Sequence, residues 1–177
     1  AVTVTATDTA GLFATDRLDV QVNTPPTAPV VHIEPLSPST VDDLLVVIDT
    51  PSTDSEGDPI TYTYAWTADS VDVGVGSTDR VDASLTEQGE RWSVTVTPSD
   101  GMHEGLGSTA TVTVLNTPPS ITAVSVTPNP ARVNDTLTCS WTDWADDDGD
   151  ADDSQLNWTV NGTNVGTDTV LMSGFVG

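Results

Sequence analysis

The sequence predicts an all-β fold made of tandem β-sandwich domains with about seven strands each. Three observations support this prediction. The 177-residue chain contains a long internal repeat, and β-branched threonine is its dominant polar residue, with 30 copies. Short alternating segments separated by turn residues also recur along the chain. Threonine favours strands because its branched side chain is stiff and packs well on a pleated surface. No useful length of the chain shows the 3.6-residue apolar period of a helix.

The internal repeat has a period close to 92 residues. The segment 23–26, Asn-Thr-Pro-Pro, returns at 116–119 with a spacing of 93. The residues before each copy match as well, because 2–8 pairs with 94–100 at a spacing of 92. Agreement over this many positions indicates duplicated structural units.

The match continues after the proline pair. Segment 31–35 pairs with 124–128 at a spacing of 93, and a one-residue deletion then returns the spacing to 92. The pairs expected at the shorter spacing include Asp43 with Asp135, Leu45 with Leu137, Val47 with Cys139, Asp54 with Asp146, and Trp66 with Trp158.

The middle repeat, 27–115, forms a complete domain in this interpretation. Its strands are expected at 29–34, 44–49, 60–67, 70–74, 79–86, 91–98 and 108–115. Seven short strands in about 90 residues are typical of an immunoglobulin-like sandwich. The run 61–66 alternates, with both tyrosines and Trp66 on one face. Trp66 is therefore expected in the core, and Trp158 in the same position of the next repeat.

The segment 54–66, Asp-Ser-Glu-Gly-Asp-Pro-Ile-Thr-Tyr-Thr-Tyr-Ala-Trp, resembles a bacterial signature, Asp-x-Asp-Gly-Asp-x-Leu-x-Tyr-x-Trp. That signature belongs to extracellular Ig-like tandem repeats of the polycystic-kidney-disease and cadherin-like types. Segment 146–158 has the same pattern, with Ser154 and Leu156 in place of the tyrosines. The resemblance implies a sandwich in a large extracellular or cell-surface protein used for adhesion, spacing or scaffolding. The Asp-Phe-Gly-Asp-Gly that often follows the tryptophan in the first type is missing, so the subfamily stays open.

The remaining segments match parts of a repeat. Residues 1–22 match the last two strands, F and G, and residues 120–177 match the first strands, A to E. The segments 23–26 and 116–119 are expected to be stiff linkers, because proline fixes φ and biases the preceding residue toward extended backbone. Residues 1–22 of one copy could complete 120–177 of a neighbouring copy. We therefore expect a head-to-tail array, either a homopolymer of separate subunits or a long tandem chain with covalent continuation. The alternative is an arbitrarily trimmed chain with disordered edges.

The charge excludes several kinds of partner. With 27 acidic residues, four arginines and no lysine, the formal net charge is −23. Almost nothing on such a chain could neutralise the phosphates of nucleic acid or an anionic membrane surface. No apolar run reaches the roughly 18 residues of a membrane span, so no membrane insertion is expected in this segment. The chain repels itself, and divalent cations would offset that repulsion.

Carboxylates cluster in the loops expected beside the linkers. The candidate metal ligands are Asp54, Glu56 and Asp58 in one B–C loop, Asp143, Asp146, Asp148 and Asp150 in the other, and Asp100 and Asp8 in F–G loops. Ca²⁺ takes six to eight oxygen ligands in flexible geometry, so calcium is the expected ion. The spacing is not that of an EF-hand. The alternative is a solvated loop in which Asp and Gly only make turns.

Two further features concern carbohydrate. Asn134, Asn157 and Asn161 each begin an Asn-x-Thr sequon, which is a candidate glycosylation site. Trp141 and Trp144 are candidates for an aromatic patch that binds surface glycans, as in an adhesin or a carbohydrate-binding module. Packing against a neighbouring domain is the alternative for both tryptophans.

No catalytic constellation is visible, so an enzyme is not expected. His32 and His103 occupy different positions of the repeat and neither recurs. Cys139 is the only cysteine, so no internal disulfide can form, and a buried small side chain on strand B is expected. The sequence thus favours a structural repeat of an extracellular filament or surface protein.

Overall fold

The computed structural model describes residues 1–19 and 22–171, and the fold is all-β. Its contacts divide the chain into two compact units. Unit 1 comprises Ala1–Leu36, Leu45–Val81 and Arg91–Val112, and unit 2 comprises Ser37–Leu44, Asp82–Glu90 and the chain from Thr113 on. Among the described residues, no helix has the length and apolar character needed to cross a membrane.

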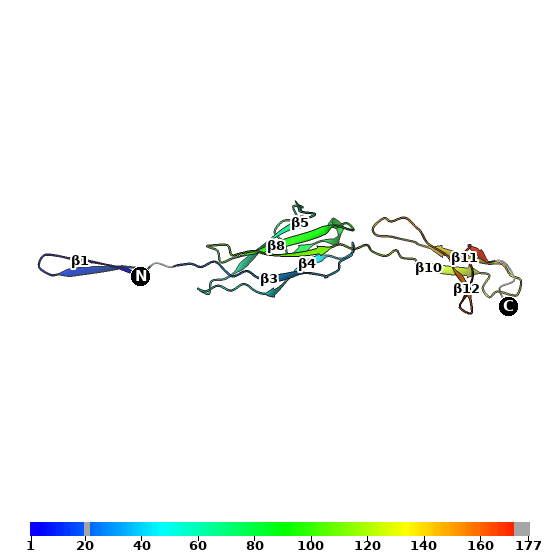
Figure 1. Cartoon of the computed structure of the whole chain (residues 1–177), viewed down its shortest axis with the longest axis horizontal. Helices are drawn as coiled ribbons and strands as arrows, with labels where there is room; N and C mark the ends of the chain where they lie inside the picture. Colours follow the sequence, from blue (N-terminus) through cyan, green and yellow to red (C-terminus); the bar gives the residue numbers. More distant parts are fainter. Residues whose placement is uncertain (20–21, 172–177) are drawn as a thin grey trace. The chain divides into compact units, whose positions relative to one another are not determined.

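Unit 1 begins with a two-stranded antiparallel hairpin. Its strands are β1 (Val2–Thr7) and β2 (Phe13–Leu18), which pair along their whole length (Figure 1). The Asp8 carboxylate closes the turn by accepting the backbone N–H of Ala10 at 2.8 Å and of Leu12 at 2.9 Å. Aspartate is favoured in turns because its side chain can replace a backbone acceptor in this way.

The seven middle strands form the two layers of a sandwich, seen in the centre of Figure 1. One sheet has the order β3-β4-β7, with β3 at Val30–Glu34, β4 at Leu44–Thr50 and β7 at Arg80–Val81. The other has the order β6-β5-β8-β9, with β6 at Val71–Asp72, β5 at Thr61–Ala68, β8 at Arg91–Ser99 and β9 at Ser108–Thr113.

These strands lie close to their predicted positions, but two are shorter than expected. The strand expected at 70–74 is reduced to the two residues of β6. The strand expected at 79–86 is reduced to the two residues of β7, and a 3₁₀ helix at Ala83–Leu85 follows it. Asp82 caps that helix by accepting the Ser84 N–H at 3.0 Å. An N-cap aspartate satisfies a backbone donor that has no partner inside the helix, which explains why the strand ends there.

The predicted core tryptophan of the middle sandwich is confirmed. Trp66 is 2% exposed, and its ring meets that of Trp92 edge-on with centroids 6.2 Å apart. The indole N–H of Trp66 donates to the Thr78 carbonyl at 2.8 Å. A buried tryptophan needs such an acceptor, because an unpaired indole N–H in the core is destabilising.

Two smaller sheets lie in unit 2. One has the order β10-β11-β14, with β10 at Ala123–Thr127, β11 at Leu137–Thr142 and β14 at Val170–Leu171. The other consists of β12 (Trp158–Val160) and β13 (Thr163–Gly166). Trp158 donates its indole N–H to the Asp168 carbonyl at 2.7 Å, as Trp66 does to Thr78. Cys139 is buried, as predicted.

The predicted pairing of the two repeats is wrong along β4 of the middle sandwich and its counterpart β11. Leu44 and Leu137 are both buried, whereas Leu45 is 41% exposed. Val46 and Cys139 are also both buried, so the spacing is still 93 along this strand. The pairings of Leu45 with Leu137, of Val47 with Cys139 and of Asp43 with Asp135 are therefore each displaced by one residue.

A β-bulge explains the displacement. In the β3–β4 ladder Val30 faces Thr50 but Val31 faces Ile48, which leaves Asp49 as an extra residue in β4. The β10–β11 ladder has no such interruption, because Ala123 faces Thr142 and Val124 faces Trp141. The one-residue deletion is thus the loss of the bulge residue, and Trp141 occupies the place of Ile48.

Candidate functional site

An acidic loop of unit 2 holds three carboxylates close together. Asp146, Asp148 and Asp150 lie between β11 and β12 and offer carboxylate oxygens within 4.8 Å of one another. No other group of this kind occurs in the described part of the chain. Carboxylates this close repel one another unless a cation or hydrogen bonds offset their charge.

The loop is built on one aspartate. Asp146 Oδ1 accepts the backbone N–H groups of Asp148 and Asp150, both at 3.0 Å. Gly149 lies between them with a φ of +75°, a left-handed conformation that glycine adopts without steric cost. The chain therefore bends around the Asp146 carboxylate, and the next acidic side chains gather on the same side.

The equivalent loop of the middle sandwich has the same construction. Asp54 Oδ1 accepts the N–H of Glu56 at 2.9 Å and of Asp58 at 3.1 Å. Gly57 has a φ of +81° in the position of Gly149. The three carboxylates of this loop do not form a close group like the one around Asp146. Asp54, Glu56 and Asp58 thus form an aspartate-centred turn, and their role as metal ligands stays a prediction.

Both proline linkers are anchored on the acidic loop of the sandwich that they enter. The Thr117 N–H donates to Asp148 Oδ2 at 2.5 Å. The Thr24 N–H donates to Glu56 Oε2 at 3.2 Å, and the Thr24 hydroxyl donates to Oε1 at 3.2 Å. Glu56 and Asp148 are 92 residues apart and the two threonines 93, so one contact occurs twice.

The first linker has a second anchor in the F–G loop. Asn23 Nδ2 donates to Asp100 Oδ2 at 2.7 Å and lies 2.8 Å from His103 Nδ1. Asp100 Oδ1 also accepts the N–H groups of Met102 and His103 at 2.7 Å each. The backbone N–H of His103, followed by the Asn23 amide, lowers the pKa of Asp100 below its ordinary value. Asp100 is therefore an acceptor for the linker.

Three carboxylate oxygens in the two acidic loops lack a partner. Asp54 Oδ2, Asp146 Oδ2 and Asp148 Oδ1 are buried atoms without a hydrogen bond. A carboxylate oxygen shielded from water is unfavourable without a donor or a cation. These atoms are oxygen donors of the type that Ca²⁺ prefers.

The other predicted ligands are not members of the close group. Asp143 is exposed, with a left-handed φ of 56°, and its carboxylate accepts the Thr142 hydroxyl at 3.4 Å. Asp8 closes the β1–β2 turn. Sequence patterning places all these residues in loops, but it cannot show which oxygens converge.

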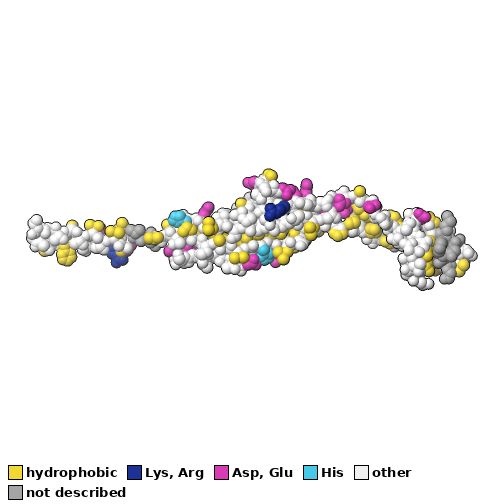
Figure 2. Space-filling view, viewed as in Figure 1, with side chains coloured by type: hydrophobic (Ala, Val, Ile, Leu, Met, Phe, Trp, Pro, Cys, Tyr) yellow, Lys and Arg dark blue, Asp and Glu magenta, His cyan; other side chains and the backbone are white. Residues whose placement is uncertain are grey.

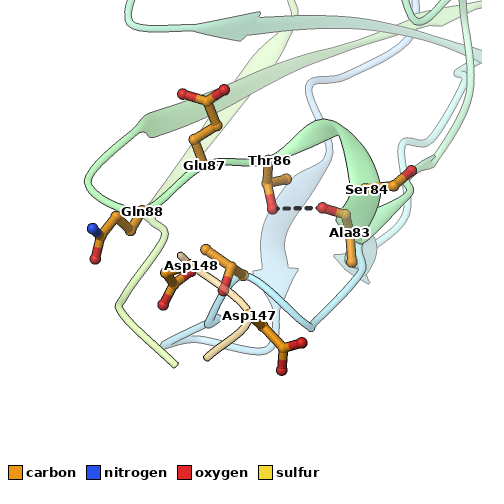
Figure 3. A pocket seen from close by; sticks show the side chains of 8 residues that line it. Ala83, Ser84, Thr86, Glu87, Gln88, Asp147 and Asp148 are labelled. Carbon is orange, nitrogen blue, oxygen red and sulfur yellow. Dashed lines mark hydrogen bonds between the residues drawn. The ribbon is translucent and has the colours of Figure 1, made fainter. Parts of the chain in front are cut away.

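A polar cavity of about 530 Å³ lies beside the acidic loop of unit 2 (Figure 3). Its lining consists of Thr40, Ala83, Ser84, Thr86, Glu87, Gln88, Asp147 and Asp148. Gln88 Nε2 donates to Asp150 Oδ1 at 3.4 Å, and the Thr86 hydroxyl donates to the Ala83 carbonyl at 3.0 Å. The cavity is wide and lined mainly by polar side chains, unlike the mostly apolar pockets of small-molecule sites.

The candidates for carbohydrate contact are in varied positions. Asn134, Asn157 and Asn161 are all exposed, and the Asn157 side-chain oxygen accepts from Asn164 at 2.9 Å. Trp141 and Trp144 are half-buried. Glycosylation and glycan binding remain predictions.

The linker anchors were missed in the sequence. The sequence predicts only stiffness for the segments 23–26 and 116–119, and the hydrogen bonds of Asn23, Thr24 and Thr117 do not follow from that prediction. The signal that could have found them is the return of the whole Asn-Thr-Pro-Pro unit. Two prolines would suffice for stiffness, so the repeated polar pair before them required a separate explanation.

No family model matches the chain, and no curated protein sequence matches it. Its fold is an immunoglobulin-like β-sandwich, on the strand order given above. Among solved structures, the chain is similar to the FN1–FN3 domains of chicken CNTN1, with 16% sequence identity and a TM-score of 0.35. The alignment covers 95% of this chain and 62% of that one, so the chain spans less than two thirds of the neighbour's length.

Proposed function

We propose that this chain is a non-catalytic structural repeat of an extracellular filament or cell-surface protein, arranged head to tail. The observation that carries the proposal is an anchor that occurs twice, each time between a proline linker and the acidic loop of the following sandwich. An anchor that recurs in this way serves the connection between domains, and a protein whose connections are built alike is suited to spacing or scaffolding.

The chemistry of the linker supports a mechanical role. Pro25 and Pro26, and likewise Pro118 and Pro119, restrict the backbone to extended conformations. Proline-rich linkers act as semi-rigid spacers. Hydrogen bonds from the preceding threonines to Glu56 and Asp148 remove further freedom at the point where each linker enters its sandwich. The array would be continued either by the same covalent chain or by strands exchanged between copies.

The composition supports a structural role at an exposed location and does not favour a binding or catalytic role. The charge of −23 makes nucleic acid and anionic membranes poor partners. The resemblance of segments 54–66 and 146–158 to bacterial Ig-like repeats points in the same direction. Extracellular location, adhesion and the polycystic-kidney-disease or cadherin-like subfamily belong to this proposal.

Calcium is proposed as the ion that stabilises the acidic loops. Asp146, Asp148 and Asp150 would hold it, with the buried unpartnered oxygens of Asp146 and Asp148 among the ligands. An all-oxygen set of carboxylates fits a hard divalent cation. When bound, the ion would neutralise the loop on which Thr117 is anchored.

Electron microscopy of the purified chain at increasing concentration tests the proposal. The expected result is filaments with a regular axial repeat. Asp148→Ala removes the acceptor of the Thr117 N–H, so its filaments should be more flexible than those of Asp147→Ala, which removes a neighbouring carboxylate that is not an anchor. Isolated particles at every concentration would contradict the polymer, and equal flexibility of both variants would contradict the role of the anchor.

A further inference from the structure

One face of the hairpin β1–β2 carries exposed aliphatic side chains, with the charged Asp16 beside them. Val2, Val4 and Leu18 are 53%, 64% and 66% exposed. Val2 lies opposite Leu18 and Val4 opposite Asp16. Side chains two residues apart along a strand share a face, so the three aliphatic side chains and Asp16 project to the same side, with Asp16 on β2. Figure 2 shows apolar side chains at the surface of this hairpin. Water contact at three large aliphatic side chains is unfavourable, so burial of this face would be favourable.

The corresponding strand of the middle sandwich, β8, has its equivalent valine side chains completely buried. At the spacing of 92, Val2 corresponds to Val94 and Val4 to Val96. Both are 0% exposed, and their strand β8 lies between β5 and β9 in the sheet. The sequence of β1 is therefore that of a strand with a partner on each side, but within the described residues β1 pairs only with β2.

The strand that would receive β1 lies in unit 2. In the middle sandwich β5 pairs with β8 over its eight residues, from Thr61 opposite Ser99 to Ala68 opposite Trp92. Its counterpart at the spacing of 92 is 153–160, of which only the last three residues form a strand, β12. In the described part of the chain β12 pairs only with β13.

The side chains of this receiving segment are incompletely covered. Trp158 is half-buried, whereas its counterpart Trp66 is 2% exposed. Leu156 is half-buried as well, in the place of Tyr64. The receiving strand thus has both a free edge and an apolar face of its own.

We propose that β1 of one copy of this chain pairs with residues 153–160 of a second copy as an antiparallel strand. The register follows from Trp66 opposite Val94 and Tyr64 opposite Val96 in the middle sandwich. It places Val2 opposite Trp158 and Val4 opposite Leu156. The inference rests on the proposed head-to-tail array and specifies the contact that would join two copies.

The opposite face of the same pairing gives sites for a cross-link. Thr63 faces Thr97 in the middle sandwich, so Thr5 of one copy would face Gln155 of the next. Both are exposed in this structure, and neither takes part in the apolar contact.

The test uses the full chain with Cys139→Ala and a pair of introduced cysteines, Thr5→Cys with Gln155→Cys, under mild oxidation near physiological salt. The control has Thr5→Cys with Thr159→Cys, which lies on the same face four residues further along. That displacement is about 13 Å at roughly 3.3 Å per residue. A disulfide needs Cα atoms within about 7 Å, so the control should not link.

The expected result is a ladder of dimers, trimers and larger species for the matched pair only, resolved without reducing agent. Equal linking of both pairs overturns the register, and a linked monomer overturns the second copy as the partner. Filaments or concentration-dependent sedimentation without matched linking overturn this pairing but leave the proposed array standing. The absence of both linking and association overturns both proposals.

A second pair of variants tests the apolar contact without cysteines. Val4→Asp places a charge on the face that would be buried, and Thr5→Asp places the same charge on the other face. Burial of an unpaired carboxylate is strongly unfavourable, so Val4→Asp should raise the concentration needed for association by roughly tenfold or more. Sedimentation velocity measures this threshold. An equal effect of the two variants overturns the assigned face.

Discussion

At the scale of single residues, His32 lies where the strand pairing of the middle sandwich is irregular. Its Nδ1 is 2.9 Å from the Oδ2 of the bulge residue Asp49, and its Nε2 is 3.4 Å from Glu34 Oε1. The hydrogen bond with Asp49, followed by that with Glu34, raises the pKa of His32 above 6.5. Both carboxylates favour the charged imidazolium of His32. The interaction of His32 with the bulge residue Asp49 therefore depends on pH.

A pH dependence follows from that pKa. Since the folded pKa of His32 is raised, its contribution to stability is complete below 6.5 and is lost as pH rises through the folded pKa. The difference in unfolding free energy between the wild type and His32→Gln should therefore shrink from pH 6 to pH 8. Urea unfolding at several pH values measures it, and parallel profiles for the two proteins would contradict the assignment. The His32 side chain is 30% exposed and its partner Asp49 45%, so the effect should also weaken with salt.

The residues of the candidate site were predictable only in part. The acidic character of the loop around Asp146 and the turn-forming role of Gly149 follow from composition and spacing. The convergence of Asp146, Asp148 and Asp150 does not, because it depends on two N–H groups bending the chain around Asp146 Oδ1. Local backbone hydrogen bonds of this kind leave little trace in a sequence.

At the scale of elements, the equivalent strands β4 and β11 show how a fold tolerates a change of length. The strands of the middle sandwich were predictable because alternation has a period of two, and Trp66 lies in the core as expected. The register of the repeat was not, because a bulge adds a residue without reversing the faces on either side. Asp49 is such a residue, and β11 achieves the same inward face without it.

Deletion of single residues from β4 tests this interpretation. Removing Asp49 joins the two regular parts of the ladder, so Leu44 and Val46 should stay buried and the loss of stability should be about 1 kcal/mol. Removing Val47 shifts the strand by one residue and turns Leu44 and Val46 outward, each with a loss of roughly 1.5–3 kcal/mol. Thermal unfolding should show a cooperative transition for the first deletion and none for the second. Similar damage in both would mean that Asp49 is not an extra residue.

At the scale of the whole molecule, the charge opposes both folding and association. With −23 formal charges and four arginines, most carboxylates have no cation within the chain. Repulsion of this kind destabilises compact states and is screened by salt, since the Debye length falls from about 30 Å at 0.01 M to about 8 Å at 0.15 M. Sodium chloride should therefore raise the melting temperature by general screening, whichever carboxylates in the chain carry the charge.

Calcium at matched ionic strength separates general screening from a specific site. If the Asp146 loop binds the ion, a concentration ten times the dissociation constant should stabilise the chain by about 1.4 kcal/mol, a rise of a few degrees that EDTA reverses. Asp146→Asn should lose this additional rise because it removes a carboxylate of the close group. Asp147→Asn, an exposed neighbour with the same change of charge, should keep it. No rise beyond that of sodium chloride at millimolar calcium, or the same response in both variants, would exclude a bound ion, and the loop would then be a turn whose charge only salt can screen.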